Sequence, residues 1–475
     1  MSIEYLGLSS INGPLVVLEG VKGAAYDEIV EMTVDGNEKR LGRIIEINND
    51  KAVIQVFEGT DRMALRNTHT KLTGKPMEIG VSEAMFGRTF NGIGEPIDGL
   101  GSVEAEKTLD VNGKPLNPVT REYPRNYIRT GISAIDGLMT LIRGQKLPIF
   151  SGNGLPHDEL AAQLVRQSSL GDSDNDDEKF AVVFAAMGVK HDVADFFQRT
   201  FAESGVSDHV ITFINLANDP VVERLITPKV ALTVAEYLAF EKGMHILVIL
   251  TDMTSFAEAM REVSSSKGEI PSRKGFPGYL YSELATIYER ACIVEGVNGS
   301  VTQIPILTMP NDDITHPIPD LTGYITEGQI VLDRDLNGQS IYPPIAVLPS
   351  LSRLMKDGIG EGFTRGDHQD VANQLFSSYS KVGDARALAS VIGEDELSDT
   401  DKKYLVFGRA FEQMFIGQSV NDNRTIFDTL DIGWNLLGLM PRGELDRIDT
   451  KVLDQYYKPT MLDANGDIVP ATVED

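Results

Sequence analysis

The sequence is poor in cysteine, in basic residues and in long apolar runs. Its one cysteine, Cys292, lies in a stretch with a helical pattern and cannot form an internal disulfide, so we expect a small core residue and a reducing compartment. The chain has 43 Lys and Arg against 70 Asp and Glu, a formal net charge of −27. A nucleic-acid-binding protein needs clustered cations to neutralise phosphates, so this balance argues against an RNA or DNA partner.

Apolar runs such as 181–189 and 246–250 are much shorter than the roughly 20 residues that cross a bilayer. The first residues lack the basic and then apolar order of a signal peptide. We therefore expect no membrane span and a cytoplasmic location, which still permits docking on a membrane complex.

At 475 residues the chain is too long for one core and is expected to form several domains. Residues 1–75 alternate like short strands and predict an N-terminal β-barrel. Residues 76–355 alternate strand and helix patterns, which predicts a parallel sheet covered by helices on both faces. Residues 356–475 are mainly amphipathic and predict a helical bundle.

The central pattern places strands and helices at defined segments. Strands are predicted at 147–150, 180–186, 210–214, 245–250 and 304–308, and helices at 159–170, 193–204, 229–242, 256–264 and 279–292. C-terminal amphipathic stretches are 371–381, 386–392 and 402–416, with Asp399 and Thr400 as N-cap types before the last of them.

An acidic tract occupies residues 172–178 (DSDNDDE). Its acids at the first, third and fifth positions are typical of a calcium loop, but the sixth position is Asp177 instead of Gly and the twelfth is Val183 instead of Glu. A solvated acidic loop is the expected structure.

Residues 150–160 (FSGNGLPHDEL) have the strand, glycine turn and helix of a phosphate-binding loop. A working loop, G-x-x-x-x-G-K-[ST], needs a glycine whose backbone wraps the phosphates, a Lys that reaches them and a hydroxyl that holds Mg²⁺. Here Gly152 and Gly154 remain, but Pro156, His157 and Asp158 stand at those three positions. Proline donates no N–H and aspartate repels phosphate, so we expect a nucleotide-binding scaffold that does not bind nucleotide tightly.

Four strings carry a resemblance to a known family: 130–138 (TGISAIDGL), 150–157 (FSGNGLPH), 316–324 (HPIPDLTGY) and 348–354 (LPSLSRL). With the order of barrel, α/β domain and helical domain, the chain resembles the non-catalytic B subunits of V-type and archaeal A-type rotary ATPases, or ATP synthases. The resemblance covers essentially the whole chain. It implies a P-loop-type, RecA-like central domain.

The resemblance also shows which catalytic groups are missing. The glutamate that activates water in the catalytic subunits belongs in a Gly-Glu-Arg string, and the matching string here is Gly188-Val189-Lys190. The acid that holds Mg²⁺ through water falls on Thr251, with Asp252 one residue later. Successive strand residues point to opposite faces, so Asp252 is not expected to compensate.

Asp252 and His157 could each act in chemistry or serve only a structural role. Asp252 could still bind metal, but an aspartate that enters a helix is commonly an N-cap, which is the role we expect. His157 could act as an acid or a ligand, but a lone histidine after proline more often caps a helix or faces solvent.

One residue points to a contribution to catalysis. Arg353 matches the position from which the family presents an arginine to the nucleotide site of the neighbouring subunit. A guanidinium stays ionised and offers a planar fork of donors to the charge that develops on a transferred phosphoryl group. Without the family string, Arg353 would be taken for an ordinary surface arginine. Ser352, beside it, and Tyr324 are further candidates for the nucleotide interface.

The resemblance therefore implies a non-catalytic ring subunit that alternates with a catalytic A subunit, three of each, and supplies Arg353 to Mg-ATP or Mg-ADP at the interface. It further implies contacts with central shaft and peripheral stalk subunits, a location peripheral to the membrane, and coupling to H⁺ or Na⁺ transport, with no cofactor or metal of its own. Two alternatives stay open. A hexameric nucleic-acid motor would hydrolyse ATP without a partner, and a purely structural scaffold would not need Arg353.

Overall fold

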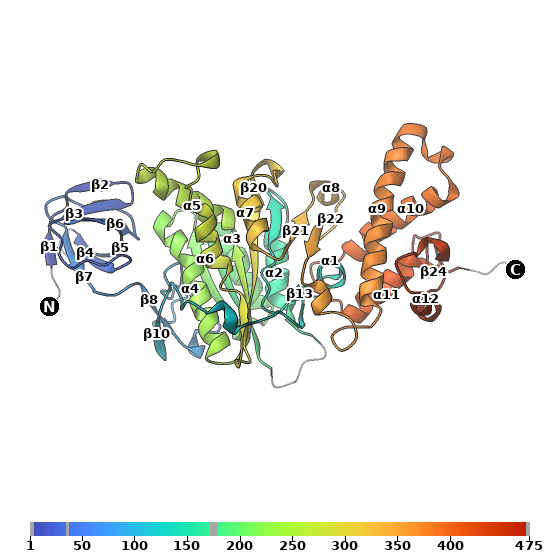
Figure 1. Ribbon diagram of the computed structural model, residues 1–475, viewed down its shortest axis with the longest axis horizontal. Coiled ribbons are helices and arrows are strands. Elements are labelled where there is room, and N and C mark those ends of the chain that lie inside the picture. Colours follow the sequence, from blue (N-terminus) through green and yellow to red (C-terminus); the bar gives the residue numbers. More distant parts are fainter. Residues whose placement is uncertain (1–3, 35–37, 172–177, 472–475) are drawn as a thin grey trace. The chain divides into compact units, whose positions relative to one another are not determined.

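A computed structural model describes residues 4–34, 38–171 and 178–471, so Asp172 to Asp177 of the acidic tract lie outside the described residues. The chain divides into two compact units. Figure 1 labels helices and strands of both. The first comprises the described residues of Met1–Glu122, Lys179–Met309 and Asp313–Ile325, and the second those of Tyr123–Glu178, Pro310–Asp312 and Thr326–Asp475. Each unit is described by itself.

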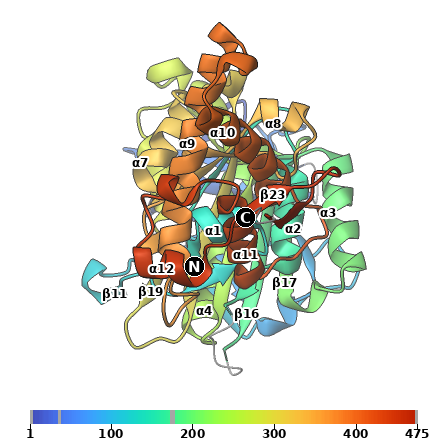
Figure 2. The same cartoon turned by 90° about the vertical axis from the view of Figure 1, so that its right-hand side faces the viewer.

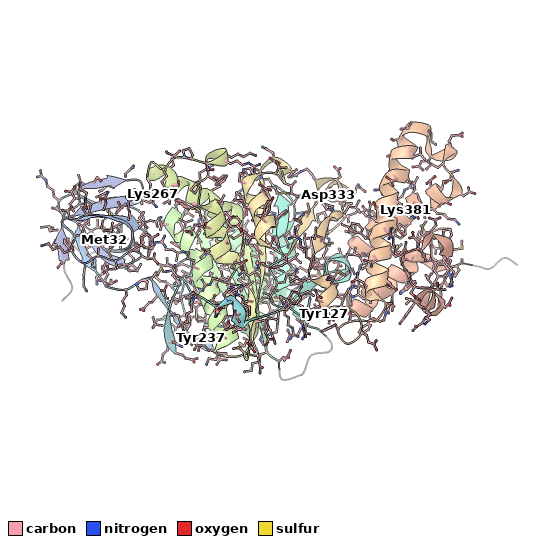
Figure 3. The ribbon with its side chains drawn as sticks, viewed as in Figure 1. Met32, Tyr127, Tyr237, Lys267, Asp333 and Lys381 are labelled. Carbon is pink, nitrogen blue, oxygen red and sulfur yellow. The ribbon has the colours of Figure 1, made fainter. Side chains whose placement is uncertain are left out.

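The first unit begins with an antiparallel sheet of seven strands in the order β1-β7-β4-β5-β6-β3-β2. Buried residues alternate with partly buried ones along β4 and the middle of β5, because one face of the sheet is buried. Val16, Val30, Met32 and Ile54 form part of its core, and Figure 3 labels Met32 within the curled sheet. The strands are β1 (Glu4–Leu6), β2 (Ser10–Asn12), β3 (Leu15–Glu19), β4 (Ile29–Val34), β5 (Glu38–Asn48), β6 (Lys51–Val56) and β7 (His69–Leu72).

The same unit contains parallel strands in the order β9-β17-β16-β18-β20. They are β9 (Thr89–Asn91), β16 (Phe180–Val189), β17 (Val210–Leu216), β18 (His245–Thr251) and β20 (Ser300–Met309). Every residue of β18 is buried, as expected for a parallel strand covered on both faces. Shorter antiparallel strands are β8 (Glu78–Val81), β10 (Lys107–Asp110), β11 (Arg121–Glu122) and β19 (Cys292–Val294).

Helices connect these strands on both faces of the sheet. The step from β16 to β17 goes toward β9, and the step from β17 to β18 goes back across the sheet toward β20. Because both crossovers are right-handed, α3 and α4, which connect these strands, lie on opposite faces. In Figure 2, α3 and α7 lie on opposite sides of the view. The helices are α3 (His191–Glu203), α4 (Val221–Phe240), α5 (Met253–Ser266), α6 (Leu280–Tyr288) and α7 (Pro317–Ile325).

The second unit combines a small sheet region with the C-terminal helices. β14 (Ile149–Gly152) pairs in parallel with β21 (Gly328–Leu332), which pairs antiparallel with β22 (Ile345–Ser352). β12 (Tyr127–Arg129) lies between β13 (Leu141–Ile142) and β15 (Ser169–Leu170). The helices are α1 (Ser133–Leu138), α2 (His157–Gln167), α8 (Arg334–Gly338), α9 (His368–Ile392), α10 (Asp399–Ala410), α11 (Ile426–Leu437) and α12 (Thr450–Tyr456).

Three predictions about local structure were wrong. Cys292 is buried in strand β19, because α6 ends at Tyr288 and the chain turns back to pair with β20. The N-cap of α10 is Ser398, whose side chain accepts from the amide of Asp401, so Asp399 is already helical. Helix α4 starts at Val221 and not at 229, because Pro228 is accommodated inside it.

The C-terminal part is helical as predicted, with two additions. The stretches 371–381 and 386–392 belong to one helix of 25 residues, α9. A two-stranded antiparallel hairpin, β23 (Thr460–Leu462) with β24 (Ile468–Pro470), follows α12.

Candidate nucleotide-site elements and the Arg353 end of β22

The phosphate-loop scaffold predicted from the sequence is present. β14 ends at Gly152 and α2 begins at His157, so residues 153–156 form the turn between them. The amide of Leu155 donates to the carbonyl of Gly152 at 3.1 Å, and the amide of His157 donates to the carbonyl of Leu155 at 2.8 Å. These bonds use amides that a working loop would direct at phosphate. Gly154 adopts φ +80°, which explains why a glycine remains there.

The start of α2 is acidic and has no side-chain cap. Pro156 occupies the N-cap position, and Asp158 and Glu159 lie in the first turn. The two carboxylates already complement the positive end of the helix dipole, so a phosphate would meet negative charge there.

His157 stands where a phosphate-binding loop has its lysine. Its Nδ1 lies 3.0 Å from the Ser151 hydroxyl, and its Nε2 lies 3.8 Å from an Asp158 oxygen. Pro156 is the N-cap of α2 and the His157 side chain is only 14% exposed, so the expectation that His157 caps the helix or faces solvent was wrong. The imidazole packs back on the strand that precedes the loop.

A salt bridge that the sequence did not reveal holds the loop. The Arg334 Nε donates to Asp312 Oδ2 at 2.7 Å, and its Nη2 donates to Asp312 Oδ1 at 2.9 Å and to the Asn153 carbonyl at 3.0 Å. The Asp312 carboxylate fills the space beside Gly152 in which a β-carbon would otherwise lie. This guanidinium lowers the pKa of the Asp312 carboxyl, so the carboxylate stays charged beside the loop.

The residues that replace the water-activating and metal-holding acids are structural. Val189 is the buried last residue of β16, and Thr251 is the buried last residue of β18. Asp252 is the N-cap of α5, as predicted, and its Oδ1 accepts from the Thr254 amide at 2.8 Å. The carboxylate also accepts from the Thr308 amide at 3.2 Å and from the Thr308 hydroxyl at 2.5 Å. These bonds occupy the carboxylate oxygens, which fits a cap better than a metal ligand.

Arg353 follows the last residue of β22 and is exposed. Its amide donates to the Glu327 carbonyl at 2.8 Å, and its Nη1 donates to the Thr326 carbonyl at 3.3 Å. Within the described part of the chain no carboxylate lies within 4.0 Å of the guanidinium. The backbone is thus fixed while the charged group keeps free donors.

The segment beneath Arg353 is held by buried polar contacts. Lys146 Nζ lies 2.5 Å from Glu327 Oε1, and the Lys146 amide donates to Glu327 Oε2 at 2.9 Å. The Ser352 hydroxyl donates to the Thr140 carbonyl at 3.0 Å and accepts from the Gln145 side chain at 2.9 Å. Sequence spacing gave no signal for these contacts, because their partners are about 180 and 210 residues apart in the chain.

Tyr324, the other predicted interface residue, is the penultimate residue of α7 and is 79% exposed. Its ring is an uncovered aromatic surface in the first unit. In residues 4–34, 38–171 and 178–471, no group of three or more His, Cys, Asp or Glu is arranged to hold a metal ion. No helix among these residues is long and apolar enough to cross a membrane.

Family models match three successive parts of the chain. Residues 8–68 match the β-barrel domain of the ATP synthase alpha/beta family, and residues 131–352 match its nucleotide-binding domain. Residues 357–457 match the C-terminal domain of V and A type ATP synthase.

Relatives match over nearly their full length. The chain is 62% identical over 96% of its length, and 99% of the relative's, to V-type ATP synthase beta chain 2 of Clostridium tetani. It is 61% identical, over 98% of its length and 99% of the relative's, to the V-type ATP synthase beta chain of Halothermothrix orenii. The solved structure of the ATP synthase protein NeqB from Nanoarcheaum equitans is 40% identical, with a TM-score of 0.70 over 89% of this chain and 98% of that one.

The barrel, the nucleotide-binding domain and these matches define the class: the chain belongs to the ATP synthase alpha/beta family. Within that family it belongs with the beta, or B, chains of the V- and A-type ATP synthases, as the sequence strings had indicated.

Proposed function

We propose that the chain is a non-catalytic subunit of a peripheral hexameric ring, in which three copies alternate with three copies of a catalytic A subunit. In this proposal Arg353 completes the partner's Mg-ATP or Mg-ADP site, while the chain's own loop does not hydrolyse nucleotide. The ring contacts a central shaft and peripheral stalks on the cytoplasmic side of the membrane, and ATP hydrolysis or synthesis is coupled to H⁺ or Na⁺ transport. No nucleic acid takes part.

The observation that carries this proposal is the contrast between the two candidate sites. The phosphate loop has lost its lysine and hydroxyl, and its turn amides bond within the loop. Arg353 has a fixed backbone and a guanidinium without a carboxylate partner in the described residues. An ionised arginine that its own chain does not neutralise is suited to stabilise the charge of a phosphoryl transition state in another chain.

Ser352 and Tyr324 support the interface in different ways. Ser352 ties the end of β22 to the chain beneath it, which positions the neighbouring Arg353. Tyr324 is 79% exposed, and we propose that the neighbouring chain buries its ring. We further propose three functional parts, 1–75, 76–355 and 356–475; each family match falls inside one of them.

The test is Arg353→Lys in a ring reconstituted with the catalytic subunit. Lysine keeps the charge but loses the planar fork, so we expect ring assembly to persist and ATP turnover to fall by roughly 10³ or more. Arg442→Lys is the matched control, because Arg442 is 44% exposed and ion-paired with Asp454. Near-normal turnover of the assembled Arg353→Lys ring would favour the structural-scaffold alternative.

A further inference from the structure

A polar cavity of about 200 Å³ lies in the first unit, where strands β5 and β6 of the N-terminal sheet face helices α4 and α5. Its polar lining residues are Arg43 and Gln55 from the sheet, Lys229 from α4, Lys267 after α5, and Glu283 and Tyr279 near α6. Figure 3 labels Lys267 at the end of α5. Three cations and one carboxylate therefore line one cavity in a chain whose net charge is −27.

Arg43 is only partly neutralised. Its Nη1 lies 3.2 Å from an Asp27 oxygen, and its Nη2 donates to the Gln55 side-chain oxygen at 3.0 Å. Its Nε is buried and has no acceptor among the residues described. The guanidinium thus has one donor without an acceptor, while Asp27 offsets part of its charge.

Lys229 is the least compensated of the three cations. Its one hydrogen-bond acceptor in the described chain is the Asn112 Oδ1 at 3.4 Å, although an ammonium group can donate three bonds. Burial lowers the pKa of Lys229, and the nearby Arg43 charge lowers it further, whereas Glu283 and Asp27 raise it. The Lys267 Nζ forms an ion pair with Glu269 Oε1 at 3.5 Å. Lys229 has no carboxylate within 4.0 Å among the described residues, so an anion in the cavity would supply the acceptors that its ammonium group lacks.

We infer that this cavity binds a small multivalent oxyanion, inorganic phosphate, between Arg43, Lys229 and Lys267. The volume admits about six waters at ~30 Å³ each, which accommodates a phosphate ion with part of its hydration. Pockets for drug-sized ligands are larger, at about 300–1,000 Å³, so a free ion suits this volume better than ADP or ATP. A phosphate ion accepts hydrogen bonds from ammonium and guanidinium groups at once.

The position of the ion gives it a structural consequence. It would contact β5 through Arg43 and α4 through Lys229, so its binding would fasten the N-terminal sheet to the helices of the same unit. A ligand that binds only the folded arrangement stabilises it in proportion to its concentration. The inference is independent of Arg353, which lies in the second unit.

The experiment is calorimetric titration of the full chain with potassium phosphate, against potassium chloride at equal ionic strength. We expect saturable binding of phosphate with a Kd of the order of 1 mM, and at least a tenfold loss of affinity in Lys229→Met. Lys71→Met is the matched control: Lys71 lies on β7 of the same sheet, is 47% exposed and pairs with Glu31, so its loss should leave binding unchanged. Arg43→Gln provides a second variant if Lys229→Met fails to fold.

Two results would overturn the inference. One is phosphate binding that is absent from the natural chain or equal in the folded Lys229→Met variant and the control. The other is Lys229-dependent binding of ADP more than tenfold tighter than that of phosphate, which would contradict the assignment from cavity size. Adenosine, which carries no phosphate, is the negative control and should not bind.

Discussion

Glu327 shows how single residues support the Arg353 end of β22. Its carboxylate accepts from both the ammonium and the amide of Lys146, and its carbonyl accepts from the amide of Arg353. Lys146 is nearly buried, with a side chain 8% exposed, so the pair lies in a weakly screened environment. Removing the charge of Glu327 takes away the carboxylate that lies 2.5 Å from the Lys146 ammonium group.

We expect Glu327→Gln to destabilise the chain by about 1–3 kcal/mol, because a charge-assisted bond becomes a neutral one. The apparent Tm should fall by less than the roughly 2–4 °C per kcal/mol that applies to domains of 150–250 residues, because the shift becomes smaller in longer chains. Turnover of the reconstituted ring should also fall, since the Arg353 backbone loses part of its support. The matched control is Glu31→Gln, whose exposed partner Lys71 lies 3.8 Å away. An unchanged Tm in both variants would show that Glu327 does not hold this segment.

At the scale of elements, the loop between β14 and α2 keeps the strand, turn and helix of a phosphate-binding loop but lacks its lysine and hydroxyl. Its turn amides bond internally, and Arg334 and Asp312 hold its first residues. The loop needs no ligand to stay folded. The same bonds compete with any phosphate that approaches.

Titration of the isolated chain with Mg-ATP should therefore give no saturable binding at micromolar protein concentration. Asp312→Asn removes the negative charge beside Gly152 and should change this little, because no lysine becomes available. Isothermal titration calorimetry measures Mg-ATP binding to the natural chain and to Asp312→Asn. A sub-micromolar Kd, or ATP hydrolysis by the chain without a partner, would instead support the independent-motor alternative.

The contact between α9 and α1 depends on a buried neutral histidine. The His368 Nε2 donates to the Gly137 carbonyl at 3.0 Å, and its Nδ1 lies 2.9 Å from the Thr364 hydroxyl. The Thr364 oxygen also accepts from the Gly360 amide, so its hydrogen is directed at Nδ1. Burial lowers the pKa of His368 from 6.5 to about 4.

The contribution of His368 to the free energy of unfolding should consequently decline as the pH falls from about 6.5 to about 4, since the unfolded chain takes up a proton there that the folded chain excludes. The loss is roughly 3 kcal/mol at most. His368→Gln should flatten this decline in urea-unfolding profiles, and exposed His209→Gln should not. Burial raises the pKa of Asp136 to about 6 and that of Glu223 to about 7, and both act in the opposite direction, so the His368 effect is read as the difference between the variants, which share these two groups. An equal decline in His368→Gln would contradict the prediction.

At the scale of the whole molecule, the net charge of −27 produces self-repulsion in the compact state. Many ion pairs are exposed, such as Lys51–Glu19 and Arg409–Glu394, and such pairs contribute little. Repulsion among the excess negative charges of the folded chain should therefore outweigh the attraction within its exposed ion pairs.

Raising NaCl from about 20 to about 300 mM shortens the Debye length and should raise the apparent Tm of the chain. Differential scanning calorimetry at constant pH measures the change. An equal concentration of an uncharged solute is the control for non-electrostatic effects. A Tm that falls with salt would show that the ion pairs dominate.

The sequence predicted element types well where burial is continuous. Strand β16 and residues 246–250 of strand β18 are continuous apolar runs, and both strands were located within a few residues. It failed where tertiary contacts override local preference, as at Pro228 inside α4 and at Cys292, which pairs with β20 instead of extending α6. Both positions are buried, so packing decides their conformation.

By itself, the sequence determined the order of barrel, α/β and helical parts, the loss of the loop's lysine and hydroxyl, and the family, because these depend on residue type and local order. Only the tertiary structure decided that Lys146 and Glu327 meet beneath Arg353, that Asp312 lies beside Gly152, and that Arg43, Lys229 and Lys267 line one cavity. These contacts join segments far apart in the chain. Their energies depend on distance and burial, which exist only after the chain has folded.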